Sequence, residues 1–407
     1  DVYKRQNKLS DKLVIFKNVQ NKITMTKHQQ RVKAVFHFFD NKDTVLGFRK
    51  MLDCAMDTQN MDVYKTAIEL TDWKEKNPEK SDELIEKCKV FLGEIEKIEV
   101  KEYPTDVAVL TAINIQKSYG SNRFSLGPVS LEIKKGQVYG LVGENGNGKT
   151  TLLRILAKEI SHNKGELKYQ FDSVPKDEFD LRTKLVYIPQ RTEKWYGSLK
   201  DNLKFVLASY GVKPEENETR TLMMIARLGL WNYKHLKWSE LSSGYKMRFE
   251  LARTLLRQPE ILLLDEPLAN LDVLAQQVIL EDLKAIANSV NNPIALILSS
   301  QQLYEVEKIS DKVIFLKNGK YQDNEIKPEA ENQNLIVEID TENSREELLQ
   351  VFQPFKLEKL NFNGGIFVAY FSPETKFSSV LSALGNSKIH VTYIRNISTS
   401  TRRFFVE

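Results

Sequence analysis

Residues 143–150 constrain the fold of this chain more than any other segment. Their sequence, GENGNGKT, satisfies the pattern G-x-x-x-x-G-K-[ST]. A short apolar run at residues 138–142 precedes it, and a run with helical character at residues 151–156 follows. Glycines let backbone N–H groups converge on an anion, and the start of the helix adds a positive end. The pattern predicts a strand, a phosphate-binding loop and a helix, with these binding residues: Gly143, Glu144, Asn145, Gly146, Asn147, Gly148, Lys149, Thr150 and Thr151.

Two carboxylates follow a second buried-strand pattern. Residues 261–264 are apolar, and Asp265 and Glu266 come directly after them. In a nucleotide site of this kind, Lys149 contacts the β- and γ-phosphates and Thr150 supplies a hydroxyl to Mg²⁺. We expect Asp265 to hold Mg²⁺ through water and Glu266 to act as the base that polarises the attacking water.

Three zones of the chain differ in pattern and predict three domains. Residues 1–103 have apolar side chains at helical spacing and almost no glycine, which predicts an all-α module. Residues 104–325 alternate β-branched and helical runs, as an α/β domain does. Residues 334–407 have a βαββαβ order, which predicts a small ferredoxin-like α+β domain.

Composition narrows the class of protein. The 407 residues carry a formal net charge of +4, which gives no reason to expect a nucleic-acid partner. The two cysteines, Cys54 and Cys88, are typical of a reducing compartment and do not form a disulfide framework. No run reaches the roughly 20 apolar residues that a membrane-spanning helix needs. We therefore expect a cytoplasmic protein. The chain begins at Asp1 without an initiator Met, and we expect the natural N-terminus to be missing.

Several further motifs, in order, resemble the nucleotide-binding domain of ABC ATPases over about residues 111–321, roughly half the chain. The resemblance implies an α/β P-loop fold of ABC type, with a mixed sheet and a helical subdomain, which binds ATP and Mg²⁺. It implies that Tyr119 stacks on adenine and that Gln190 joins the Mg²⁺ site to the helical subdomain. It also implies that the signature segment LSSGY, with Ser242, Ser243 and Gly244, contacts the γ-phosphate of ATP held by an opposite subunit. Asp272 then lies in a loop that contacts the other subunit of the dimer.

The chain departs from the family pattern at two places. Ser243 and Tyr245 stand where Gly and Gln are commonest in the signature segment, a mild change. Gln301 stands after the last sheet strand, where the family usually has a histidine that contacts the γ-phosphate. Charge-assisted hydrogen bonds contribute about 1.5–3 kcal/mol and neutral ones about 0.5–1.5 kcal/mol. Because Gln301 can donate only a neutral hydrogen bond, we expect hydrolysis that is slow but real. We expect catalytic roles for Glu266, Gln190 and Gln301.

The resemblance implies a subunit that works as a homodimer or heterodimer and drives separate transmembrane permease subunits from the inner face of the cell membrane. A single nucleotide-binding domain followed by a small C-terminal domain favours a bacterial exporter. Trp195 and Tyr196, just after Gln190, lie where a permease would dock, although they also suit packing within the domain. The alternative is a soluble ABC ATPase that acts as a switch on a macromolecular or regulatory partner. The cargo, and the roles of the N-terminal module and the C-terminal domain, do not follow from the sequence.

Overall fold

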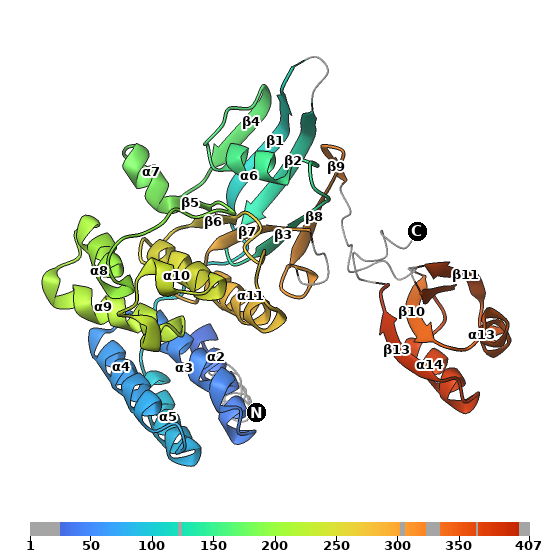
Figure 1. Cartoon of the computed structure of the whole chain (residues 1–407), viewed down its shortest axis with the longest axis horizontal. Helices are drawn as coiled ribbons and strands as arrows, with labels where there is room; N and C mark the ends of the chain where they lie inside the picture. Colours follow the sequence, from blue (N-terminus) through green and yellow to red (C-terminus); the bar gives the residue numbers. More distant parts are fainter. Residues whose placement is uncertain (1–24, 121–123, 302–305, 323–333, 364, 399–407) are drawn as a thin grey trace, which may run out of the picture. The chain divides into compact units, whose positions relative to one another are not determined.

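The computed structural model describes residues 25–120, 124–301, 306–322, 334–363 and 365–398. Figure 1 shows and labels its helices and strands. The chain divides into two compact units. Unit 1 contains residues 1–103, 203–235 and 289–292, and unit 2 contains residues 104–202, 236–288 and 293–407. The N-terminal helices therefore share a compact unit with two segments that the sequence pattern assigned to the ATPase domain.

Unit 1 is helical. Some of its helices begin at side-chain caps: Thr26 forms a capping box with Gln29, and the Asn60 side chain accepts hydrogen bonds from the first turn of the helix that it precedes. Apolar faces at helical spacing pack these helices together. The elements are α2 (Lys27–Asp40), α3 (Thr44–Asp57), α4 (Met61–Lys76), α5 (Ser81–Ile95), α9 (Pro214–Arg227) and the 3₁₀ turn η1 (Trp231–Tyr233). Helix α8 (Leu199–Ser209) starts in unit 2 and continues into unit 1.

Two buried aspartates of α3 join distant parts of unit 1. Asp53 pairs with Arg227 at the end of α9, with 2.7 Å between the charged atoms. Asp57 pairs with Arg31 at 2.6 Å and accepts a hydrogen bond of 2.7 Å from the Ser289 hydroxyl. Buried charges need such partners, because an unpaired one costs several kcal/mol. These pairs therefore specify how α3 packs against residues far along the chain.

Both cysteines lie in the same helical unit, and we expect them to be inert in the folded protein. Cys54 and Cys88 are 1% and 0% exposed, and burial raises the pKa of each thiol to about 12. At pH 8 only about one thiol in 10⁴ would then be ionised, and the thiolate is the reactive form. Ellman's reagent should label neither cysteine in native buffer and both in denaturant. Rapid labelling of native protein would contradict this packing.

The core of unit 2 is a six-stranded sheet with the order β5-β6-β7-β3-β8-β9, parallel except for the edge strand β9. The strands are β3 (Val138–Val142), β5 (Leu185–Ile188), β6 (Ile261–Leu264), β7 (Ala295–Ser300), β8 (Lys312–Lys317) and β9 (Lys320–Gln322). The inner strands β3, β6 and β7 are buried throughout, as in parallel sheets covered on both faces. Their carboxyl ends meet at one edge, where the two predicted motifs begin.

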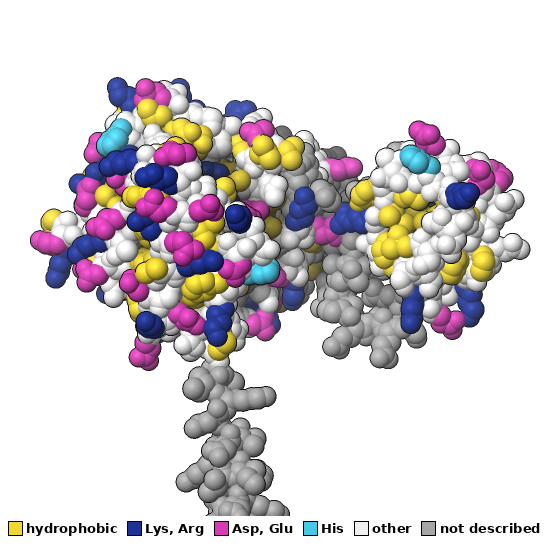
Figure 2. Space-filling model, turned by 90° about the horizontal axis from the view of Figure 1, so that it is seen from below, with side chains coloured by type: hydrophobic (Ala, Val, Ile, Leu, Met, Phe, Trp, Pro, Cys, Tyr) yellow, Lys and Arg dark blue, Asp and Glu magenta, His cyan; other side chains and the backbone are white. Residues whose placement is uncertain are grey.

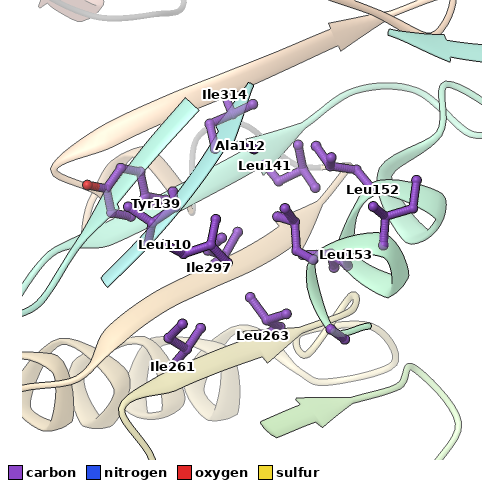
Figure 3. Packing of buried hydrophobic residues seen from close by; sticks show 14 of the residues in the cluster. Leu110, Ala112, Tyr139, Leu141, Leu152, Leu153, Ile261, Leu263, Ile297 and Ile314 are labelled. Atoms are coloured by element: carbon purple, nitrogen blue, oxygen red, sulfur yellow. The ribbon is translucent and has the colours of Figure 1, made fainter. Parts of the chain in front are cut away.

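A second, antiparallel sheet packs over the helix that follows β3. It has the order β2-β1-β4, with β1 (Ala108–Ser118), β2 (Ser125–Lys134) and β4 (Lys164–Tyr169). Figure 3 shows Leu110 and Ala112 of β1 in one apolar cluster with Leu152 and Leu153 of α6 (Lys149–Leu156) and residues of the central sheet. Other helices of the ATPase part of unit 2 include α7 (Glu178–Lys184), η2 (Trp238–Glu240), α10 (Ser243–Leu255) and α11 (Val273–Ala287).

The C-terminal domain is a four-stranded antiparallel sheet with the order β11-β12-β10-β13 and two helices. Its elements follow the predicted order: β10 (Leu335–Thr341), α13 (Arg345–Phe352), β11 (Leu357–Asn363), β12 (Ile366–Phe371), α14 (Phe377–Asn386) and β13 (Val391–Asn396). Alternate strand residues form a core with both helices. The predicted fold class, a mixed α/β domain between an all-α module and a ferredoxin-like domain, is confirmed.

The surface has the character that the composition predicts. Figure 2 shows basic and acidic side chains interspersed over the visible face, with apolar groups in small clusters between them. Within the described ranges, every helix is too short or too polar to cross a bilayer.

Candidate active site

The loop after β3 is shaped for close approach of its backbone to a ligand. A side chain at Gly143 would bring its Cβ to 2.5 Å from the Leu316 carbonyl oxygen, so only glycine fits. Gly148 has φ of 96°, in the left-handed region that favours glycine, and is the cap residue of α6. The Asn147 side chain accepts a hydrogen bond of 3.0 Å from the Asn318 backbone, which fixes the loop against the turn after β8.

Lys149 is 6% exposed, and its ammonium group is held by the loop. Nζ donates to the carbonyl oxygens of Gly143 at 2.6 Å and Glu144 at 3.3 Å. It also forms an ion pair with the Glu266 carboxylate at 3.2 Å. The cation predicted to bind phosphate and the predicted base are thus direct neighbours, and a phosphate group at Lys149 would be adjacent to Glu266.

A hydrogen-bonded cluster holds the two acidic residues after β6. The Ser299 hydroxyl donates to Asp265 at 2.8 Å and accepts from the Glu266 backbone N–H at 2.9 Å. The Tyr187 hydroxyl donates to the other Asp265 oxygen at 3.2 Å. Burial, and then the nearby Asp265 charge, raises the pKa of Tyr187, so its phenol stays a donor. Glu266 has φ of 50°, an uncommon conformation for a residue other than glycine. The cluster therefore fixes the backbone of Glu266 and holds the Asp265 carboxylate as an acceptor.

A cavity of about 330 Å³ lies at this edge of the sheet. It brings together residues that are as many as 177 positions apart in the sequence, from Phe124 to Gln301. The loop and the start of α6 line it together with Gln190, Glu266 and Gln301. The lining residues are Phe124, Glu144, Asn145, Gly146, Gly148, Lys149, Thr150, Thr151, Gln190, Glu266 and Gln301.

Other predicted residues lie outside the lining of this cavity. Tyr119 is 44% exposed, directly after β1, with Lys117 Nζ 5.4 Å from its ring centre. Ser242 is the exposed cap of α10, and the hydroxyl of the exposed Ser243 donates to the Asn270 carbonyl oxygen at 3.0 Å. Gly244 is half-buried against Ala275, and the exposed Asp272 caps α11 through the Ala275 backbone N–H. The signature segment thus faces outward from its own chain.

Three residues of the site were missed by the sequence reasoning. Phe124 lines the cavity, and Ser299 and Tyr187 hold the carboxylates. Ser299 and Tyr187 had a usable signal, because both lie near the carboxyl ends of strands that run parallel to β6. Phe124 lies just before β2, in a segment without a distinctive pattern.

The donor set fits Mg-ATP. Lys149 and the loop amides suit phosphate oxygens, and the Thr150 hydroxyl and the Gln190 amide line the cavity as oxygen ligands of the kind that Mg²⁺ takes. Asp265 is 4% exposed and lies outside the lining, next to Glu266, where it would hold Mg²⁺ through water. Both Asp265 oxygens already accept hydrogen bonds, which suits an outer-shell role. Bound Mg²⁺ would supply charge stabilisation to the transferring phosphoryl group.

Gln301 is exposed and lines the cavity, so its amide is available to a terminal phosphate. We expect Gln301→Ala to slow hydrolysis about five- to tenfold, the effect of losing roughly 1 kcal/mol of hydrogen bonding in the transition state. Gln301→His should speed it by a similar factor, most strongly below about pH 7, where the histidine is protonated. Steady-state phosphate release at saturating Mg-ATP measures both. Equal rates in all three proteins would exclude Gln301 from the reaction.

Residues 126–269 match the family model described as ABC transporter. The chain is 28% identical to a phosphonates import ATP-binding protein of Treponema denticola, over 52% of this chain and 87% of the relative. It is 33% identical to an uncharacterised ABC transporter ATP-binding protein of Methanocaldococcus jannaschii (51% and 73%). It is 31% identical to a lantibiotic transport ATP-binding protein of Streptococcus pyogenes (51% and 86%). Among solved structures, cbiO1 from Clostridium perfringens, part of the transporter complex cbiONQ, aligns with a TM-score of 0.48 and 22% identity, over 53% of this chain and 88% of that chain.

Proposed function

The chain belongs to the ATP-binding proteins of the ABC transporter family, and from this premise we propose that it pairs with a second nucleotide-binding subunit and drives a separate membrane permease. As a member of this family it binds ATP with Mg²⁺ and hydrolyses it. The observation that carries the proposal is the arrangement of one cavity: Lys149, Glu266, Gln190 and Gln301 line it, whereas the signature segment is exposed elsewhere on the domain.

The roles of the site residues follow from their chemistry. Lys149, Thr150 and the loop amides bind and orient the phosphates. Glu266, whose backbone is held by Ser299, accepts a proton from the attacking water, which lowers the barrier as general base catalysis does. Gln190 and Gln301 are neutral amides that donate to the terminal phosphate or ligate Mg²⁺.

The exposed signature and the surface beside it support a shared site. Ser242 and Ser243 are exposed at the start of α10, although their hydroxyls suit phosphate. Val273 and Leu274, directly after Asp272, are each 75% exposed. Adjacent exposed apolar side chains are typical of a contact surface, here for a second nucleotide-binding domain of the same or a related chain.

The segment after Gln190 supports a permease contact through one aromatic residue. Trp195 is half-buried, and its ring centre lies 6.5 Å from that of Phe249 and under the Arg253 guanidinium, so it packs within the domain. Tyr196 is 92% exposed. An exposed aromatic ring suits a groove or helix of a partner, since such residues often dominate binding energies. We assign the docking role to Tyr196, on the cytoplasmic face of the membrane, and infer the export direction from the domain layout alone.

Tyr196→Ala should release the protein from membranes that contain its permease, lowering bound protein at least about tenfold, as loss of an interface anchor does. ATP affinity should change less than twofold, because Tyr196 is outside the cavity lining. Membrane-bound protein is measured by sedimenting membranes from cells that co-express the neighbouring genes. Tyr393→Ala, in the C-terminal domain, is the control. If the unmodified protein never sediments with membranes, a soluble switch is the better function. Transport of substrate into or out of vesicles decides direction.

A further inference from the structure

Between Gln190 and the start of α8 the chain has little backbone support. Residues 191–197 form no helix or strand, and Ser198 forms an isolated bridge with Lys237. Side chains therefore hold this segment. Asn202 donates to the carbonyl oxygens of Tyr196 at 2.8 Å and Ser198 at 2.7 Å, and Trp195 makes the contact with another element.

The Trp195 side chain is fastened to α10 by a buried carboxylate. Its indole Nε1 donates to Glu250 Oε1 at 2.8 Å. The other Glu250 oxygen accepts from Arg253 Nε at 3.1 Å and from its terminal nitrogen at 2.8 Å. The Arg253 guanidinium lies 4.2 Å from the Trp195 ring centre. The Glu250 side chain is 2% exposed, so both of its oxygens are satisfied by this cluster and water does not compete.

The position of Glu250 on α10 links this cluster to the signature. Helix α10 begins at Ser243, and Glu250 follows seven residues later, which is two turns and about 10 Å along the axis on the same face. Trp195 follows Gln190, which lines the cavity, by five residues. A short tether therefore runs from the cavity wall of this chain to the helix that carries Ser242 and Ser243.

We propose that Trp195, Glu250 and Arg253 are positioning residues that couple the Gln190 segment to the signature helix. The proposal rests on the shared-site function above. A terminal phosphate contacted by Gln190 orders the segment that bears Trp195, and the Trp195–Glu250 bond passes this restraint to α10. When nucleotide fills the cavity of one chain, the signature segment of that same chain is thus held in the orientation in which it can contact ATP on the second subunit. None of the three residues touches the nucleotide.

Trp195→Phe tests the link, because it keeps an aromatic ring against Arg253 and Phe249 and removes the N–H donor. We expect kcat to fall about tenfold, with affinity for a fluorescent ATP analogue and Tm nearly unchanged. Glu250→Gln should have a similar effect through loss of the Arg253 pair. The double variant Trp195→Phe/Glu250→Gln should have a kcat no lower than that of the less active single variant. The reason is that the effects of residues that act as a unit are not additive. Trp73→Phe, the same change in the helical unit, is the control and should leave kcat unchanged.

ATP-driven dimerisation separates a positioning role from a structural one. In a Glu266→Gln background, Trp195→Phe should raise the Mg-ATP concentration needed for half-dimerisation about tenfold. Three results would each overturn the coupling role. The first is that Trp195→Phe changes neither kcat nor dimerisation, and the second is that the losses multiply in the double variant. The third is that Trp195→Phe lowers Tm and ATP affinity together. If Glu266→Gln alone stays monomeric in ATP, the shared-site function fails together with the link. If Glu266→Gln dimerises and its Trp195→Phe derivative does so equally well, only the link fails.

Discussion

Glu266→Gln should lower ATP hydrolysis by about 10²–10⁴-fold, the usual contribution of a positioned general base. The amide keeps the shape of the side chain but cannot accept the proton of the attacking water. The Lys149–Glu266 ion pair of 3.2 Å places this carboxylate beside the phosphate-binding cation, so no other carboxylate of the described site residues is as well placed. Steady-state phosphate release measures the loss.

A matched control for this variant is Glu132→Gln, on β2, where the side chain is 53% exposed and lies outside the cavity. Its rate should equal that of the unmodified protein. ATP binding by Glu266→Gln should persist, since Lys149 and the loop remain. A loss of less than about tenfold would show that another group activates the water.

Asp53→Asn should lower the free energy of unfolding of the helical unit by about 3–5 kcal/mol, as removal of one partner from a buried ion pair does. Arg227 is 6% exposed and Asp53 is 9% exposed, so the substitution leaves a buried guanidinium without its carboxylate. Urea denaturation followed by circular dichroism gives the change, and Ellman's reagent reports exposure of Cys54 and Cys88 in the same unit.

The control for Asp53→Asn is Asp62→Asn, in the same unit. Asp62 pairs with Lys65 at 2.9 Å, but the two side chains are 88% and 60% exposed. Exposed pairs contribute little, so this variant should lose less than about 1 kcal/mol. Equal effects of the two substitutions would mean that the Asp53–Arg227 pair does not hold α3 to α9.

Local patterns were enough to predict the strand–loop–helix unit. The apolar run that became β3 ends where Gly143 begins the loop, and Lys149 begins α6 as the motif requires. The acidic pair after β6 and the two glutamines were likewise predicted from motif order. Each of these features depends on residues within a few positions of one another, or on a fixed order of motifs.

Contacts between distant residues could not be read in the same way. The Ser299 bridge to Asp265 depends on the register of β6 against β7, which no local pattern specifies. The grouping of the N-terminal helices with α9 depends on a pair 174 positions apart, Asp53 and Arg227. By sequence, Trp195 and Tyr196 suited either packing or docking. The structure separates them: Trp195 is half-buried and bonded to Glu250, whereas Tyr196 is 92% exposed.

The mass of Glu266→Gln in solution tests the shared-site mechanism most directly. Light scattering coupled to size exclusion should show one chain without nucleotide and twice that mass with Mg-ATP, because the trapped ATP is contacted by the signature of a second copy. Ser242→Arg in the same background should stay monomeric, since its bulk would block the opposite phosphate. A single-chain mass at saturating Mg-ATP, or a dimer that Ser242→Arg leaves intact, would contradict the mechanism.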